Sequence, residues 1–264
     1  MCSFFGYSRG TYYKEKKLNE EKMKNKEKVI DFVKEFRKQQ PRVGTRKLLP
    51  ELKEKCLNIG RDAFFKVLKE QDLLIEPKKK FSRTTYSNHG YVVAPNEIKN
   101  LAIVEPNQVW VSDITYIRLS EGKFAYLFLT TDLYSRKIMG YHLSQDLTHH
   151  GALICLNNAI TLVGDPREII HHSDRGVQYC CHEFKNLIQN FKMKLSMTDE
   201  NHCYQNAVAE RLNGILKDEF DLDKCFENIY DAKRSVERAV SVYNNRRRHF
   251  SLNLMTPEQF YEAA

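Results

Sequence analysis

The sequence contains no long apolar run, and its first residues lack the apolar segment of a secretory signal peptide. A membrane-spanning helix needs about 18 or more apolar residues in succession, and a signal peptide needs a shorter apolar stretch near the start. We therefore expect a protein of the cytoplasm that has no membrane partner.

Cysteine is also scarce, with seven residues, an odd number, that follow no regular framework. This usage favours a reducing compartment over a disulfide scaffold. The neighbours Cys180 and Cys181 lie close in sequence to His171 and His172, but the four residues lack the spacing of a zinc site. The chain has 42 Lys and Arg against 34 Asp and Glu, a formal charge of +8. That balance suits a polyanion such as DNA, although charge alone does not decide it.

The sequence contains three carboxylates whose neighbouring residues allow their side chains to point toward one site. Asp113 interrupts a β-branched and aromatic run, residues 109–117, which is typical of a buried strand. Asp174 follows a short apolar stretch and precedes Arg175-Gly176, as at a strand that enters a turn. Glu210 lies in residues 204–220, which have helical periodicity.

The helix of Glu210 has two distinct faces. Its apolar residues fall on one side, and Glu210 is predicted to point the other way, out of the core, with Asn206, Asn213, Gly214 and Lys217. A glycine within a helix costs about 1 kcal/mol relative to alanine, so Gly214 suggests that another backbone approaches there. Lys217 suits a phosphate, although a solvated lysine has the same pattern.

Two aspartates and one glutamate on separate elements form an all-oxygen ligand set, which Mg²⁺ and Mn²⁺ prefer. Such a site supports phosphoryl transfer with two ions, one at the attacking oxygen and one at the leaving oxygen. A charge buried on a strand is costly unless it is paired or binds a metal. The sequence therefore predicts a site for two Mg²⁺ or Mn²⁺ ions at Asp113, Asp174 and Glu210.

Three blocks resemble the DDE integrase core, more narrowly the OrfB transposases of the insertion-sequence-three family. They are residues 110–116 (WVSDITY), 172–179 (HSDRGVQY) and 206–210 (NAVAE), and 35 residues separate Asp174 from Glu210 as in that family's D,D-35-E pattern. The resemblance implies a metal-dependent transposase that cuts element ends and joins them to target DNA. It also implies an OrfA partner or fusion and a homo-oligomer assembled on DNA. Gln205 stands where the family commonly has an aspartate.

The resemblance also suggests residues that contact DNA. Arg175 and Gln178, beside Asp174, are plausible contacts with phosphates or the scissile strand, although surface hydrogen bonds explain them equally well. Asn206, Asn213 and Lys217 share the face of Glu210. The zinc module that precedes the core in retroviral relatives is not expected, because the first histidine is His89.

The chain is predicted to divide into four segments. Residues 1–28 form a basic segment, and residues 29–75 read as three helices that resemble a helix-turn-helix module with Arg61 and Lys66 near DNA. A helical cap on the core is the alternative. Pro50 is expected to kink the second helix. Residues 76–105 read as a basic linker, and residues 106–264 as the catalytic core with a helical tail.

Within the core, strands at 109–119, 124–129 and 137–143 are joined by connections too short for helical crossovers, which favours antiparallel pairing. Helices are expected at 148–162 and 182–191, and further strands before Asp174 and at 194–197. This order predicts an α/β ribonuclease-H-like mixed sheet flanked by helices. Asp132 is expected to hold a turn rather than a metal ion.

The tail, residues 229–247, reads as an amphipathic helix that ends in a basic cluster, Arg246-Arg247-Arg248. This cluster either holds target DNA or packs on the core. Two other functions remain open at this stage. A ribonuclease-H-type or junction nuclease shares the fold and the carboxylates, and an inactive DNA-binding regulator or decayed copy needs no metal ion.

Overall fold

The computed structural model describes residues 9–76, 92–199 and 206–264. Its contacts divide the chain into two compact units near residue 78, and each unit is described by itself. None of the described helices is both long and apolar enough to span a membrane.

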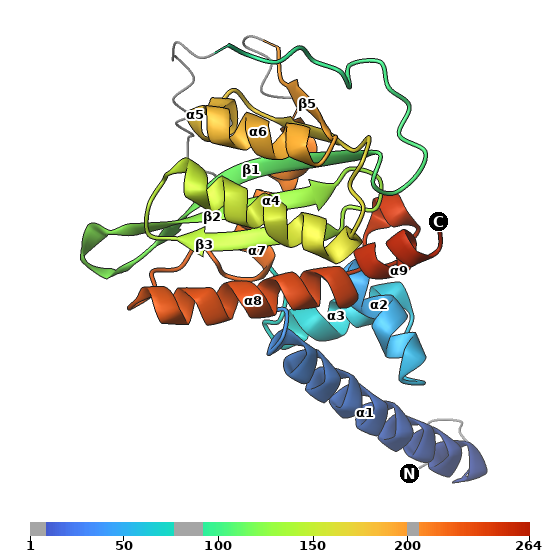
Figure 1. Ribbon diagram of the computed structural model, residues 1–264. Coiled ribbons are helices and arrows are strands. Elements are labelled where there is room, and N and C mark those ends of the chain that lie inside the picture. Colours follow the sequence, from blue (N-terminus) through green and yellow to red (C-terminus); the bar gives the residue numbers. More distant parts are fainter. Residues whose placement is uncertain (1–8, 77–91, 200–205) are drawn as a thin grey trace. The chain divides into compact units, whose positions relative to one another are not determined.

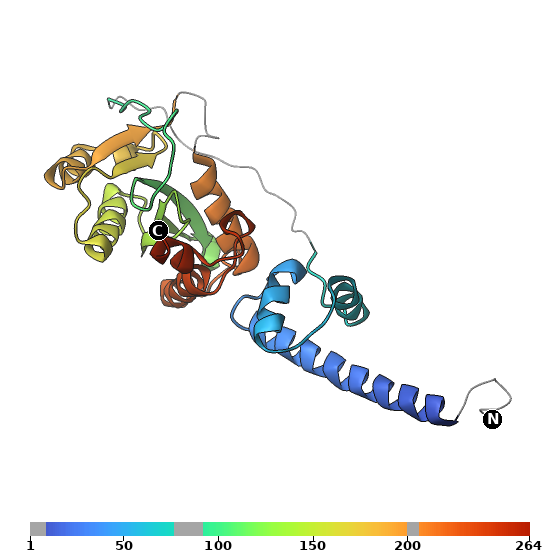
Figure 2. The ribbon, with the colours of Figure 1, turned by 90° about the vertical axis from the view of Figure 1, so that its right-hand side faces the viewer.

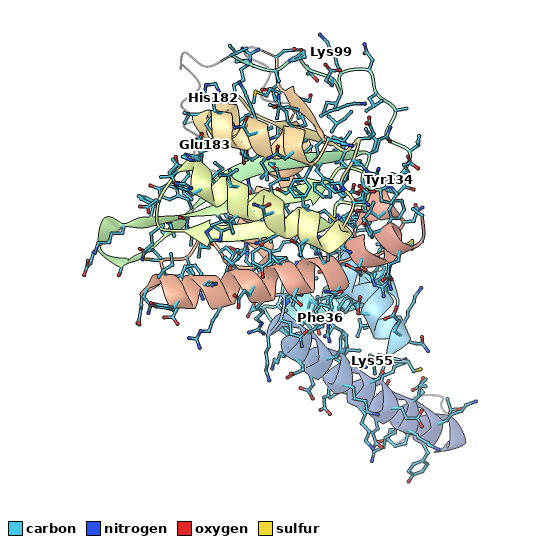
Figure 3. All side chains as sticks on the ribbon, viewed as in Figure 1. Phe36, Lys55, Lys99, Tyr134, His182 and Glu183 are labelled. Atoms are coloured by element: carbon cyan, nitrogen blue, oxygen red, sulfur yellow. The ribbon has the colours of Figure 1, made fainter. Side chains whose placement is uncertain are left out.

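The first unit contains three helices, as the apolar spacing of residues 29–75 predicts. They are α1 (Arg9–Arg37), α2 (Thr45–Glu54) and α3 (Arg61–Glu70). The second half of α1 supplies Val29 and Val33 to a small apolar core, which Phe36 flanks (Figure 3). Residues 10–24, in the first half of α1, are all exposed. The helix runs without a break through residue 28, so one element joins the basic segment to the helical module.

Pro50 lies inside α2, and the helix continues past it to Glu54. Proline lacks the N–H that would bond the carbonyl one turn earlier. Leu48 and Leu52 on either side of Pro50 are fully or almost fully buried. Burial of this apolar face offsets the missing hydrogen bond.

The second unit is built on a five-stranded mixed sheet with the order β3-β2-β1-β4-β5. The strands are β1 (Val109–Arg118), β2 (Phe124–Asp132), β3 (Ile138–Ser144), β4 (Ile170–Ser173) and β5 (Lys194–Met197). The first three pair antiparallel, and β4 and β5 run parallel to β1. The turn between β1 and β2 uses Glu121 and Gly122 with φ of 57° and 71°, the left-handed conformation that glycine adopts easily.

Helices cover both faces of this sheet (Figures 1 and 2). One face carries α4 (His149–Val163), α5 (Val177–Cys180) and α6 (His182–Asn190), and the other carries α7 (Ala207–Glu219) and α8 (Ile229–Asn245). Short 3₁₀ turns lie at Ser120–Gly122 and Phe250–Leu252, and α9 (Pro257–Glu262) ends the chain. The close approach of α4 needs Gly151, because a Cβ there would lie 2.3 Å from the Phe128 ring.

The described part of the predicted linker, residues 92–105, packs on the second unit. The Pro95 carbonyl accepts a hydrogen bond from the Met197 N–H (3.3 Å), and the Glu97 N–H donates to Ser196 Oγ (2.9 Å). Ile98 and Ile103 pack against the apolar cluster between β1 and α7. Residues 92–105 therefore belong to the second unit, whereas residues 77–91 lie outside the described residues.

The end of α8 is fastened to the rest of the unit by buried polar contacts. The Asn244 amide accepts from the Ile138 N–H and donates to the Ile138 carbonyl, both at 2.9 Å, so it pairs with β3 as a strand residue would. Arg247 makes a two-pronged ion pair with Glu219 at the end of α7, with N–O distances of 2.9 and 2.7 Å. Of the two interpretations of the basic tail, packing on the core therefore holds for Arg247.

Candidate active site

Asp113 is a buried carboxylate in the middle of β1, as its apolar surroundings predict. Only 6% of its surface is exposed. Its Oδ1 accepts a hydrogen bond from the N–H of Ile114 (2.9 Å), and its Oδ2 accepts one from the Asn213 side-chain amide (2.7 Å). Burial without polar contacts would cost a carboxylate several kcal/mol, so these two donors help to hold its charge and fix its orientation.

Asp174 comes directly after β4, next to the strand that carries Asp113. Ser112 and Ser173 are partners in the parallel pairing of β1 and β4, so the two aspartates continue adjacent strands about 5 Å apart. The Gly176 N–H donates to Asp174 Oδ1 (3.0 Å), and a Cβ at Gly176 would lie 3.0 Å from that oxygen. Because glycine has no Cβ, the turn has space for the Asp174 carboxylate next to the Gly176 N–H.

Tyr179 is a buried phenol on α5, five residues after Asp174. Burial raises the pKa of its hydroxyl well above the usual value, and the negative charges of Asp174 and Asp113 raise it further. The phenol is therefore neutral at physiological pH. Tyr179 was not among the predicted site residues, although it is the last residue of the HSDRGVQY block that resembles the integrase core.

The helix α7 packs against β1 and presents a polar face to the middle of this strand. The Asn206 amide donates to the Ser112 carbonyl (3.0 Å), and Asn213 donates to Asp113. Glu210 lies four residues after the first asparagine and three before the second, so it belongs to the same helix face. That spacing places Glu210 between the two asparagines that contact β1, and Lys217 follows on the same face; both side chains are half-buried.

Two expectations for this face were wrong. Asn206 and Asn213 are 3% and 7% exposed, so these two residues are enclosed against β1 and do not point out of the core, whereas Glu210, Gly214 and Lys217 are half-buried. The apolar pattern located the side of α7 that packs on α8 and β2, but it could not show that the opposite side is also covered. In addition, a Cβ at Gly214 would meet no described atom within 4 Å, so no backbone segment that the structure describes approaches there.

Asp113, Asp174 and Glu210 lie on β1, directly after β4 and on α7, which are neighbouring elements of the second unit. Among the described residues, no three His, Cys, Asp or Glu side chains lie close enough together to hold one metal ion. Among the residues that the structure describes, the side-chain carbonyl oxygens of Asn206 and Asn213 are both buried and find no hydrogen-bond partner. The two asparagines that contact β1 therefore each retain a buried acceptor oxygen.

A hydrogen-bonded chain supports β1 beneath the site. His171 Nε2 lies 2.8 Å from Ser112 Oγ, which lies 2.9 Å from Thr130 Oγ1 on the next strand. Burial lowers the pKa of His171 to about 3, so its ring is neutral at physiological pH. These contacts tie β4, β1 and β2 together at the level of Asp113, and the sequence pattern gave no sign of them.

The other residues predicted to contact DNA lie in the loops around Asp174 or on α3 of the first unit. The Arg175 guanidinium donates through Nε to the Thr198 carbonyl (2.8 Å), and the buried Gln178 amide donates to the Leu147 carbonyl (3.2 Å). Both side chains brace the loops around Asp174. Arg61 and Lys66 are exposed on α3 of the first unit, and Arg61 pairs with Asp62 (2.8 Å).

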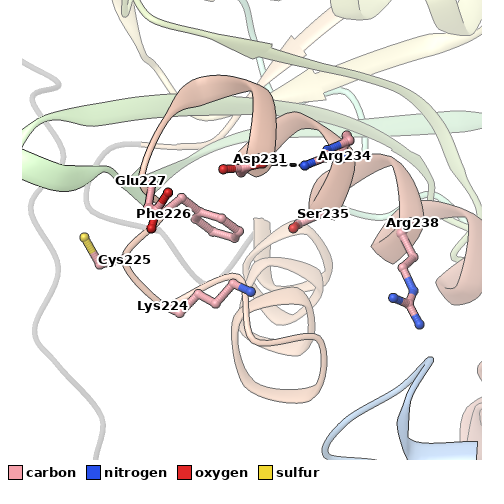
Figure 4. A pocket seen from close by; sticks show the side chains of 8 residues that line it. All are labelled: Lys224, Cys225, Phe226, Glu227, Asp231, Arg234, Ser235 and Arg238. Carbon is pink, nitrogen blue, oxygen red and sulfur yellow. Dashed lines mark hydrogen bonds and ion pairs between the residues drawn. The ribbon is translucent and has the colours of Figure 1, made fainter.

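Two further features lie outside the site. Asp132 is fully buried and accepts hydrogen bonds from Ser135 and Asn107, with distances of 2.6–2.8 Å, which is the turn role expected for it. An open hollow of about 500 Å³ lies at the start of α8, where Asp231 and Arg234 form an ion pair of 2.6 Å (Figure 4). Its lining contains none of the predicted catalytic residues.

Comparison with known proteins identifies the fold and the family. Two integrase core domain families match residues 104–203 and 191–257. The structure resembles a chain of the simian T-cell lymphotropic virus intasome solved in complex with PP2A regulatory subunit B56 gamma. The TM-score is 0.53 and the identity 16%, over 84% of this chain and 72% of the other. This likeness shows the ribonuclease-H-like fold of integrase cores.

Relatives by sequence extend over almost the whole chain. An uncharacterized 31 kDa protein of insertion element IS600 from Shigella sonnei is 35% identical over 99% of this chain and 97% of its own length. The transposase InsF for insertion sequence IS3A from Escherichia coli is 32% identical over 85% of this chain and 78% of its own length. The chain therefore belongs to the IS3 family of insertion-sequence transposases, polynucleotidyl transferases built on an integrase catalytic core.

Proposed function

We propose that Asp113, Asp174 and Glu210 are the catalytic carboxylates of this transposase and hold two Mg²⁺ or Mn²⁺ ions. The observation that carries the proposal is the meeting of β1, β4 and α7. Asp113 and Asp174 continue adjacent parallel strands, and Asn213 ties α7 to Asp113 at 2.7 Å. Glu210 lies on the helix face that makes this contact.

The donor chemistry fits hard divalent cations. Asp113, Asp174 and Glu210 offer only oxygen, as Mg²⁺ and Mn²⁺ prefer. Asn213 adds a buried carbonyl oxygen that accepts no hydrogen bond from the described part of the chain. When bound, such ions supply positive charge at the attacking and leaving oxygens of an in-line displacement. The chain thus has the ligands for the ions, and Glu210 has to join the other two carboxylates when they bind.

The protein's own residues orient these ligands and the DNA. Asn213 fixes the Asp113 carboxylate, and Asn206 anchors the start of α7 on Ser112. Lys217 and the Arg175 guanidinium position phosphates, since both carry a positive charge on the elements that hold Glu210 and Asp174. Water attacks a phosphodiester at the element end first. The freed 3′-hydroxyl then attacks a phosphodiester of the target DNA in line. A new ester bond forms while the 3′-oxygen of the target strand leaves, so no covalent enzyme intermediate is needed.

The partners of the reaction follow from this chemistry. We propose that the substrates are element-end and target DNA in the cytoplasm, that the protein acts as an oligomer on DNA, and that OrfA is supplied as a partner or by fusion. The exposed Arg61 and Lys66 on α3 of the first unit suit contacts with DNA. Residues 29–75 then form the DNA-binding module, and residues 106–264 the catalytic core with its tail.

The test is the cleavage and joining of labelled DNA from the ends of the protein's own element, with OrfA present and absent. We expect both products with Mg²⁺ or Mn²⁺ and neither with EDTA. Metal-independent binding without cleavage under any condition would contradict the proposal and favour a regulator or decayed copy. Metal-dependent cleavage without joining would favour a nuclease.

A further inference from the structure

The first half of α1 extends away from the other two helices of the first unit (Figure 2). Residues 10–24 are all exposed, whereas Val29 and Val33 in the second half are fully buried. A helix without tertiary packing is marginal in water, because most helical stability in proteins comes from the burial of one face. The first unit therefore carries about four turns of helix whose side chains no described residue of that unit buries.

The positive charge of this part of α1 lies on one side of the helix. Residues 10–28 contain seven lysines and four glutamates, a net charge of +3. At about 100° per residue, a single arc of about 80° holds four of these lysines and one glutamate, which accounts for the whole +3. The rest of the surface has three lysines and three glutamates and is neutral. The four lysines of the arc, all exposed, are called the lysine stripe: Lys14, Lys17, Lys24 and Lys28.

The lysine stripe begins beside the turn that leads into α3. The Asn25 side chain donates to the Asn58 carbonyl (3.2 Å), and Arg61 at the start of α3 follows three residues later. Lys28 is three residues after Asn25 and therefore its neighbour on the helix surface. From there the stripe runs toward the start of α1 over about 21 Å, at 1.5 Å per residue. DNA that Arg61 contacts can therefore continue along the stripe.

We propose that the lysine stripe binds the phosphate backbone of duplex DNA next to the segment that α3 contacts. Each strand of a duplex carries about one phosphate per 3.4 Å of helix axis, so about six phosphates of one strand match the length of the stripe. A lysine ammonium binds a phosphate as a point charge, and contacts with phosphates carry no sequence information directly. The inference rests on the proposed function in taking DNA as the substrate, and it adds a contact that is independent of sequence.

Two other partners fit this helix less well. In a pair of identical chains the two stripes would repel each other, because they carry the same charge. An anionic membrane needs an apolar face opposite the charged one. The exposed apolar side chains do not form such a face, since Leu18 lies about 140° around the helix axis from both Tyr13 and Met23, at about 100° per residue.

The remaining alternative is that water alone surrounds the lysines. The test compares Lys17→Gln combined with Lys24→Gln, the stripe pair, with a control pair on other sides of the same helix half. The control pair, Lys16→Gln with Lys22→Gln, removes the same charge from positions that are also exposed. Binding of the full chain to a labelled duplex of unrelated sequence is followed by fluorescence anisotropy in EDTA, over a range of KCl concentrations.

Each lost phosphate contact lowers the slope of log K against log salt by about 0.9 in magnitude. The stripe pair should therefore lower the slope by about 1.8 and weaken binding at least about tenfold at physiological salt. The control pair should keep the slope of wild type. A duplex from the element end should give the same difference between the two pairs, because phosphates are common to both duplexes.

A second matched comparison gives a gain of affinity, which a misfolded helix cannot produce. Glu21 is the single glutamate within the arc of the lysine stripe, and Glu15 is an exposed glutamate outside it. Glu21→Gln removes a negative charge beside the bound phosphates and should tighten binding at least about twofold. Glu15→Gln should have a smaller effect, because its charge lies on another side of the helix.

Equal slopes for the stripe pair and the control pair would overturn the inference. Binding to phosphatidylserine vesicles and sedimentation of the same variants distinguish the other partners. If the stripe pair lost vesicle binding or changed its oligomeric state while the slope with DNA stayed the same, the stripe would belong to a membrane or a second copy, and the inference would be wrong. Failure of wild type to bind any duplex would overturn both this inference and DNA as the substrate. Binding in EDTA needs no catalysis, so failure of the proposed catalytic site alone would leave the slopes unchanged.

Discussion

Glu210→Gln is expected to lower both cleavage and joining by about a thousandfold or more, without lowering stability. Glutamine keeps the shape of the side chain and removes the charge that holds a divalent ion. An ion of this kind contributes several kcal/mol of transition-state stabilisation, and each 1.4 kcal/mol changes the rate about tenfold. Asp113→Asn should have the same effect, since both residues are proposed to serve the same ions. Gel assays of end-labelled DNA measure both steps.

The matched control for Glu210→Gln is Asp218→Asn, because Asp218 is an exposed carboxylate near the end of the same helix. It should leave both steps within about twofold of wild type, since surface changes of this kind shift stability by no more than about 0.5 kcal/mol. Normal joining by Glu210→Gln would remove Glu210 from the site. If Asp218→Asn also lost activity, the effect of Glu210→Gln would reflect the charge of α7 as a whole and not the loss of a metal ligand.

Arg247→Ala should destabilise the catalytic unit by about 3–5 kcal/mol, the cost of breaking a buried ion pair. The Arg247 side chain is 4% exposed and that of Glu219 is 16% exposed. Arg247 also donates to His249 Nε2 (2.7 Å), so its loss leaves two partners without their donor. Urea unfolding followed by the fluorescence of Trp110 measures this change. Trp110 is the single tryptophan and is buried in β1, so it reports the catalytic unit alone.

Two further variants separate the ion pair from general effects of charge. Arg246→Ala removes an exposed neighbouring arginine and should change the free energy of unfolding by no more than about 0.5 kcal/mol. The double replacement Arg247→Met with Glu219→Leu should recover most of the stability, because apolar side chains of similar size can replace a buried pair. A small effect of Arg247→Ala, equal to that of Arg246→Ala, would show that this pair does not hold the tail.

The arrangement of the core strands was predictable because their side-chain patterns are local. The run from Val109 to Ile117 has the residue types of a buried strand, and the short connections to β2 and β3 permit only antiparallel pairing. The placing of Asp113 on β1 and of Asp174 after β4 followed from the same patterns. Apolar spacing at 100° per residue likewise predicted α7 and α8.

The contacts that assemble the site were not predictable, because they join residues far apart in sequence. Asn213 lies 100 residues from Asp113, and their hydrogen bond depends on how α7 crosses β1. Amphipathic spacing located the apolar side of α7 but not the strand that covers its polar side. The contact of Arg247 was not predictable for the same reason. A basic cluster after an amphipathic helix has the same sequence pattern whether it contacts DNA or a partly buried glutamate.

The most direct test of the central claim is the number of Mn²⁺ ions that the protein binds with DNA from the ends of its element. Titration followed by electron paramagnetic resonance counts them in wild type and in Asp113→Asn, Asp174→Asn and Glu210→Gln. We expect two saturable ions in wild type and the loss of at least one in each variant. Two ions retained in any of the three variants, or none bound by active wild type, would contradict the assignment of these carboxylates as metal ligands.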